Sequence, residues 1–86
     1  MQEILVYSTP SCPYCVRAKG LLQSKGYSYK EIDVSQDTAV RDAMVVKAGG
    51  RRTVPQIFIG STHVGGFDDL NALERAGKLE SLVMAA

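Results

Sequence analysis

The sequence is short of the residues that mark several large classes of protein. It has no tryptophan, one histidine, three prolines and two cysteines in 86 residues. Two cysteines separated by only two residues cannot join distant parts of the chain, which excludes a disulfide scaffold of the secreted kind. In a reducing compartment, such a pair indicates redox catalysis or metal binding.

Long apolar runs and an excess of one charge are also absent. Apolar runs such as Ile4–Tyr7 and Ile57–Ile59 are short and fall far below the ~18 residues that suggest a membrane span. No basic segment followed by an apolar one precedes the first run, so we expect no secretory signal and a cytoplasmic location. The net charge of +1 provides no long-range field. We therefore expect neither a nucleic acid nor a membrane as partner.

The hydrophobic share of 45% and the charged share of 22% are those of an ordinary globular protein. A chain of this length forms one domain, over residues 1–86. Apolar periodicity and turn residues predict the order β-α-β-α-β-β-α. The expected strands are 3–8, 27–34, 56–59 and 62–65, and the expected helices are 13–25, 36–48 and a region from about 68 that Gly77 divides.

Several residues should set the limits of these elements. Pro13 suits the first position of a helix, and Gly26 suits the position just after its end. We expect Ser35 to cap the second helix, and Asp68 or Asp69 to cap the third. The first helix should turn Val16, Leu21 and Leu22 to one side, and Gly60-Ser61 should form a type II′ hairpin turn. The fold class is then α/β, with one mixed sheet covered by helices on both faces.

The two cysteines lie where the first strand passes into the first helix. Cys12 stands at the helix N-terminus, where free N–H groups and the macrodipole stabilise an anion, so its thiolate is the expected nucleophile. Cys15 lies three residues further on the same helical face, within reach of a disulfide. We expect Cys15 to be more buried and less acidic, and to act as the resolving thiol.

A Cys-x-x-C pair alone also fits half of a zinc site. Zinc ordinarily takes four ligands, and only His63 could join these two cysteines, so we expect no metal site unless two chains share one. Inert buried cysteines are a further alternative. A junction between strand and helix within a β-α-β unit favours the redox interpretation over both.

Three motifs together resemble the glutaredoxin family. They are Cys12-Pro13-Tyr14-Cys15, then Thr53-Val54-Pro55 before the third strand, and Gly65-Gly66-Phe67-Asp68-Asp69 at the start of the third helix. Their order and spacing cover residues 4 to about 76. Thioredoxins typically carry Gly-Pro between the cysteines and lack the last motif. The resemblance implies a thioredoxin-like fold with a four-stranded sheet, no bound cofactor, and glutathione as co-substrate of a monomer that reduces protein disulfides and glutathionylated proteins.

The resemblance also implies a set of glutathione contacts. A cis Val54–Pro55 bond would present the Val54 backbone to an extended ligand beside Cys12. Gly65 and Gly66 would allow close approach, and the N–H groups at Phe67 and Asp68 would bind the γ-glutamyl carboxylate, with the Asp68 carboxylate holding the α-ammonium. The remaining expected contacts are Tyr14 beside the sulfur, Thr53, and Arg51 at the glycyl carboxylate in preference to Arg52, with Gln56 and Lys47 as weaker candidates.

One position departs from the family pattern. Many members carry a lysine three residues before the first cysteine, and here that residue is Thr9. Without that cation, the helix terminus has to supply more of the thiolate's stabilisation. Two other functions stay open: a thioredoxin-like reductant recycled by a flavoprotein reductase, and a dimeric iron–sulfur carrier that uses Cys12 and glutathione. Pro13 directly after Cys12, together with the presence of Cys15, disfavours the carrier.

Overall fold

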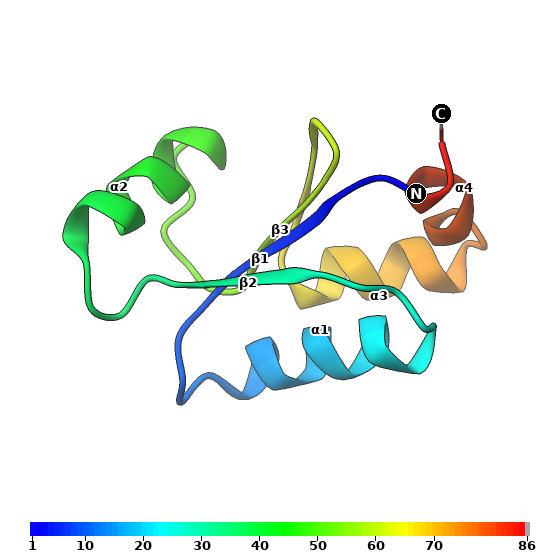
Figure 1. The fold of residues 1–86 in the computed structure, drawn as a ribbon, viewed down its shortest axis with the longest axis horizontal. Coiled ribbons are helices and arrows are strands. Elements are labelled where there is room, and N and C mark those ends of the chain that lie inside the picture. The colour runs from blue at the N-terminus through cyan, green and yellow to red at the C-terminus, as the bar shows by residue number, and fades with distance from the viewer. Residues whose placement is uncertain (86) are drawn as a thin grey trace.

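The computed structural model describes residues 1–85 and contains one four-stranded sheet with helices on both of its faces (Figure 1). The elements in chain order are β1 (Ile4–Ser8), α1 (Pro13–Ser24), β2 (Lys30–Asp33), α2 (Thr38–Lys47), β3 (Gln56–Ile59), β4 (Thr62–Gly65), α3 (Phe67–Arg75) and α4 (Leu79–Val83). The expected element order and mixed sheet are confirmed, and Gly77 does separate the last two helices.

The strands lie in the order β2-β1-β3-β4. β1 pairs in parallel with β2 and antiparallel with β3, and β3 pairs antiparallel with β4. Ile59 pairs with Thr62 across the hairpin turn, where Gly60 has a φ of 58° and Ser61 a negative φ, as a type II′ turn requires. Charged residues occupy β2, one of the two edge strands, and protect that edge from pairing with another chain.

Alternation along the strands divides the core between the two faces of the sheet. Ile4 and Val6 of β1 join the core beneath α1, α3 and α4, whereas Tyr7 joins the core beneath α2. Figure 1 shows α1 and α3 on one face of the sheet and α2 on the other. Both faces of β1 are therefore covered, as its dense apolar sequence predicts. None of the helices described over residues 1–85 combines the length and apolarity needed to cross a membrane.

The boundaries of three elements differ from those expected. Asp37, rather than Ser35, caps α2, because its Oδ1 accepts the N–H groups of Ala39 and Val40 at 2.9 and 3.4 Å. Ser35 is engaged with Asp33, to which it donates both its N–H and its hydroxyl. The strand expected over residues 27–34 is shorter in the structure, where β2 spans only Lys30–Asp33.

The third helix also begins earlier than expected. Gly66 is its N-cap, so neither Asp68 nor Asp69 takes that position. Asp69 instead reaches back, and its Oδ2 accepts the Gly66 N–H at 3.0 Å.

The buried face of α1 also differs in part from the expected one. Cys15, Ala18 and Leu22 are its buried residues, while Val16 is 59% exposed. A residue directly after a buried helical position lies about 100° around the helix, which turns Val16 away from the core.

Candidate active site

Cys12 is the N-cap of α1, directly after the loop that follows β1. Its Sγ accepts the Cys15 N–H at 3.2 Å and lies 3.6 Å from the Val54 carbonyl oxygen, to which the thiol can donate. Both cysteines are free thiols, Cys12 half-buried and Cys15 fully buried. Helix geometry thus directs a backbone donor at the Cys12 sulfur, which suits a group that carries negative charge during reaction.

Cys15 has the opposite environment. Burial, aided by its hydrogen bond with Cys12, raises the pKa of the Cys15 thiol to about 12, against the weaker opposing effects of a Thr9 backbone hydrogen bond and the Lys19 charge. The thiolate is the reactive form of a cysteine. Because its pKa is raised, Cys15 is a protonated, unreactive thiol at neutral pH. This confirms that Cys15 is the more buried of the two cysteines.

The loop before β3 brings its backbone beside Cys12. The Val54–Pro55 peptide bond is cis, as expected. The fully buried Gln56 holds this loop through its Nε2, which donates to the Thr53 carbonyl at 2.9 Å and to Thr53 Oγ1 at 3.2 Å. Its Oε1 accepts from His63 Nε2 at 2.7 Å. The Gln56 amide is therefore already occupied within the protein.

A cavity of about 420 Å³ lies against the same loop. It brings together eight of the residues expected to contact glutathione: Tyr14 from α1, then Arg51, Thr53, Val54 and Pro55, and finally Gly66, Phe67 and Asp68 at the start of α3. Asp69 also lines it, whereas Arg52 and Lys47 do not. Lys47 is placed against Tyr7 and Phe58 on the α2 side of the sheet.

Asp69 is the site residue that sequence reasoning missed. Its Oδ2 lies 3.3 Å from Arg51 Nη1 and also accepts the Gly66 N–H. The hydrogen bond from the Gly66 N–H lowers the pKa of the Asp69 carboxyl most. The hydrogen bond and charge of Arg51 lower it further. The Asp69 carboxylate orients Arg51, which lines the cavity. The sequence did not reveal this role because Asp68 and Asp69 are identical neighbours.

The charge of Asp69 should be visible in the pH dependence of folding. A carboxyl whose pKa is lowered by folding stabilises the native state above its unfolded pKa of ~3.9, and loses that effect as pH falls through its folded pKa. We expect Asp69→Asn to lower the free energy of unfolding above about pH 4, by less than ~1 kcal/mol because both side chains are half exposed. Urea unfolding between pH 2 and pH 7 measures this. A difference that stays constant over that range would assign Asp69 a role in geometry alone.

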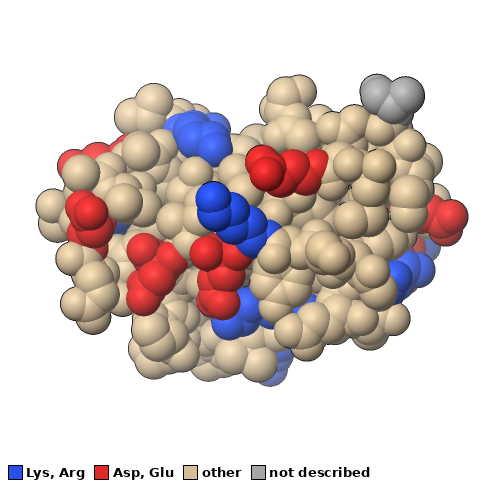
Figure 2. Space-filling model, in the orientation of Figure 1, with Lys and Arg blue, Asp and Glu red and all other residues tan. Residues whose placement is uncertain are grey.

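Acidic and basic side chains are interspersed over the face that Figure 2 shows, and the net charge is only +1, so the surface provides no long-range field. Thr9, in place of the lysine of many glutaredoxins, meets Cys12 through its backbone, whose carbonyl accepts the Cys12 N–H at 3.4 Å. A bound anion would therefore depend on local contacts.

Comparisons with known proteins agree with this geometry. The family model described as Glutaredoxin matches residues 4–64. A glutaredoxin of Pseudomonas aeruginosa is 54% identical over 99% of this chain and 100% of its own length, and glutaredoxin 3 of Escherichia coli is 48% identical over 96% and 99%. The structure of a buckwheat glutaredoxin–glutathione complex aligns with a TM-score of 0.87 at 35% identity, covering 95% of this chain and 76% of that one. The fold is thus the thioredoxin-like α/β fold, and the chain belongs to the glutaredoxin family.

Proposed function

We propose that this glutaredoxin reduces protein disulfides and glutathione mixed disulfides, with Cys12 as nucleophile, Cys15 as resolving thiol and glutathione as reductant. The observation that carries the proposal is the cavity beside Cys12, which collects eight of the residues expected to contact glutathione. Family membership supports glutathione-dependent thiol chemistry in general, and the contrast between the two cysteines supports the division of roles. We propose that it acts as a single-domain monomer over residues 1–86, in the cytoplasm.

In the proposed reaction, the Cys12 thiolate attacks a glutathionylated protein at the glutathione sulfur and releases the protein thiol. The product is a disulfide between Cys12 and glutathione. A second glutathione attacks that bond, which regenerates Cys12 and releases glutathione disulfide. With a protein disulfide, Cys12 forms a mixed disulfide with the protein and Cys15 displaces it, leaving the Cys12–Cys15 disulfide for glutathione to reduce.

The cavity would hold the glutathionyl group through several kinds of contact. The Thr53–Pro55 backbone would pair with the peptide as a strand edge does. Arg51 would bind the glycyl carboxylate, and the N-terminus of α3 at Phe67 and Asp68 would bind the γ-glutamyl carboxylate, with the Asp68 side chain on the α-ammonium. Tyr14, which is 51% exposed, would flank the sulfur.

The Cys15→Ser variant separates the two routes. We expect it to retain reduction of a small glutathione mixed disulfide in an assay coupled to glutathione reductase, because only Cys12 and glutathione take part. Reduction of a protein disulfide should fall at least ~10-fold, because the resolving thiol is gone. Thermal unfolding of the variant serves as the control for folding.

Two results would contradict the proposal. One is equal loss of both activities in the folded Cys15→Ser variant. The other is efficient recycling of the wild-type protein by a flavoprotein reductase with no dependence on glutathione, which would favour a thioredoxin-like reductant. Visible absorption after anaerobic reconstitution with iron and sulfide tests the iron–sulfur alternative separately.

A further inference from the structure

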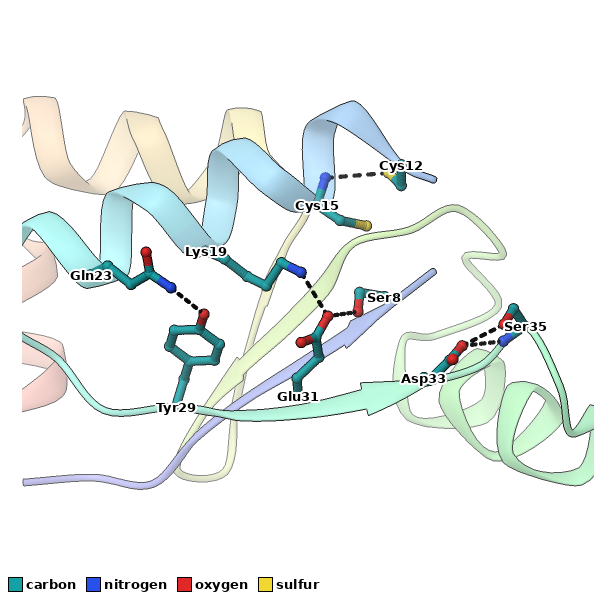
Figure 3. Close-up of polar contacts among 9 residues, drawn as sticks. All are labelled: Ser8, Cys12, Cys15, Lys19, Gln23, Tyr29, Glu31, Asp33 and Ser35. Carbon is teal, nitrogen blue, oxygen red and sulfur yellow. Dashed lines mark hydrogen bonds and ion pairs between the residues drawn. The ribbon is translucent and has the colours of Figure 1, made fainter. Parts of the chain in front are cut away.

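A charged cluster lies behind the active site, one helical turn beyond Cys15. Lys19 of α1 places its Nζ 2.8 Å from Glu31 Oε2 of β2, and the buried Ser8 at the end of β1 donates its hydroxyl to the same oxygen at 2.6 Å. Figure 3 shows this chain of contacts crossing from the helix to the sheet. Three elements therefore fix the position of the Lys19 ammonium.

This cluster is separate from the glutathione cavity. It lines a second hollow of about 410 Å³, formed by Ser8, Pro10, Lys19, Glu31 and Asp33, and none of these residues lines the first. The Lys19 side chain is 23% exposed, so it contacts both solvent and the interior. Positions four apart on a helix are neighbours, and in Figure 3 Cys15 and Lys19 leave α1 on the side that faces the sheet.

The resolving step poses an electrostatic problem that this cluster can address. Cys15 has to become a thiolate, yet burial holds its pKa far above neutral pH. The titratable side chains that act on the Cys15 thiol are Cys12 and Lys19, and Lys19 is the cation of the two. Glu31 pairs with Lys19, and Asp33 lines the same hollow. The hydrogen bond with Glu31 raises the pKa of Lys19, which keeps it protonated over the working range of pH.

We propose that Lys19 is a positioning residue for the resolving step, in which its ammonium, held by Glu31 and Ser8, stabilises the Cys15 thiolate as it attacks. This inference rests on the proposed function. The Cys15 thiol gives its proton to solvent, its sulfur bonds to Cys12 Sγ, and the bond between Cys12 and the glutathione sulfur breaks. Glutathione leaves as a thiolate and takes a proton from solvent, so that one thiol is consumed and one is released.

The test is the pH profile of ring closure. Reduced protein is mixed rapidly with glutathione disulfide, quenched in acid, and analysed by mass spectrometry, which separates the glutathionyl adduct from the lighter internal disulfide. We expect Lys19→Met to slow closure roughly threefold to fivefold at pH 7 and to move the midpoint of the profile upward, as loss of one partly solvated charge implies. Lys19→Arg keeps the charge and should restore most of the rate.

Glu31→Gln provides the contrasting variant. It removes the carboxylate that offsets the ammonium, so we expect the midpoint to move downward, opposite to Lys19→Met. A purely structural role would slow closure in both variants without moving the midpoint, and that result would overturn the inference. The same variants in a Cys15→Ser background should leave reduction of a small mixed disulfide unchanged. If that activity is absent in Cys15→Ser itself, the proposed function fails instead.

Discussion

Replacing Cys12 with serine is expected to abolish glutathione-coupled reduction, with a loss of at least ~10³-fold toward the uncatalysed rate. A hydroxyl cannot form the mixed disulfide through which exchange proceeds. The fully buried Cys15 is a poor substitute, because its raised pKa keeps it protonated. The fold should survive, since the side chain at the N-cap of α1 is only half-buried and serine is a favourable residue there.

The coupled assay with a small mixed disulfide measures this loss, and the neighbouring Ser11 offers a matched control. Ser11 is exposed, so Ser11→Ala should leave the rate within about twofold of wild type. Substantial turnover by a folded Cys12→Ser variant would show that another group attacks the disulfide. The assignment of the nucleophile would then be wrong.

The Gly65→Ala variant should lose both stability and affinity for glutathione. Gly65 has a φ of 115°, which an L-residue adopts only at a cost of about 1–3 kcal/mol. Its new Cβ would also collide with Asp69 Oδ2 and come within 2.7 Å of Arg51 Nη1. The pair that orients Arg51 would be forced apart. We expect the free energy of unfolding to fall by about 2 kcal/mol and the KM for glutathione to rise roughly threefold to tenfold.

Gly20→Ala is the control for this substitution. Gly20 lies in α1 with no atom within 4 Å of its added Cβ and without a positive φ, so alanine should stabilise the helix by up to ~1 kcal/mol. Urea unfolding and glutathione saturation curves measure both variants. If Gly65→Ala matched wild type in stability and in KM, the conformation at Gly65 and its contact with the Arg51–Asp69 pair would both be wrong.

Local signals in the sequence were sufficient to predict which segments form the strands of the sheet and how the two cysteines differ in burial. Dense β-forming runs marked the strands, and Pro13 and Gly26 marked the two ends of α1. Position at a strand-to-helix junction was enough to predict that Cys15 is the more buried cysteine, and burial raises the pKa of its thiol. These features depend on residues that are neighbours in the sequence, so the sequence alone was enough to predict them.

Choices between equivalent neighbours could not be predicted. Ser35 and Asp37 are both good N-caps, but Ser35 is engaged with Asp33 and Asp37 takes the cap position. Asp68 and Asp69 are equally acidic, yet the helix phase directs Asp69 back to Gly66 and Arg51. A one-residue difference in phase rotates a side chain by about 100°, and composition does not carry that information.

Long-range polar contacts were the other omission. Gln56 belongs to a strand in which every residue is buried, and its amide fixes the loop at Thr53 while it accepts from His63 on β4. The Lys19–Glu31 ion pair likewise joins a helix to a strand 12 residues away. Buried polar groups have to find partners, but the identity of each partner depends on the tertiary fold.

The most direct test of the proposed mechanism is to locate the covalent intermediate. Reduced Cys15→Ser protein is treated with a glutathionylated peptide, quenched in acid, digested and mapped by mass spectrometry. The mechanism predicts one glutathionyl group per chain, on Cys12, and its removal by added glutathione. The mechanism would be contradicted if the protein removed glutathione from the peptide and no adduct formed on Cys12.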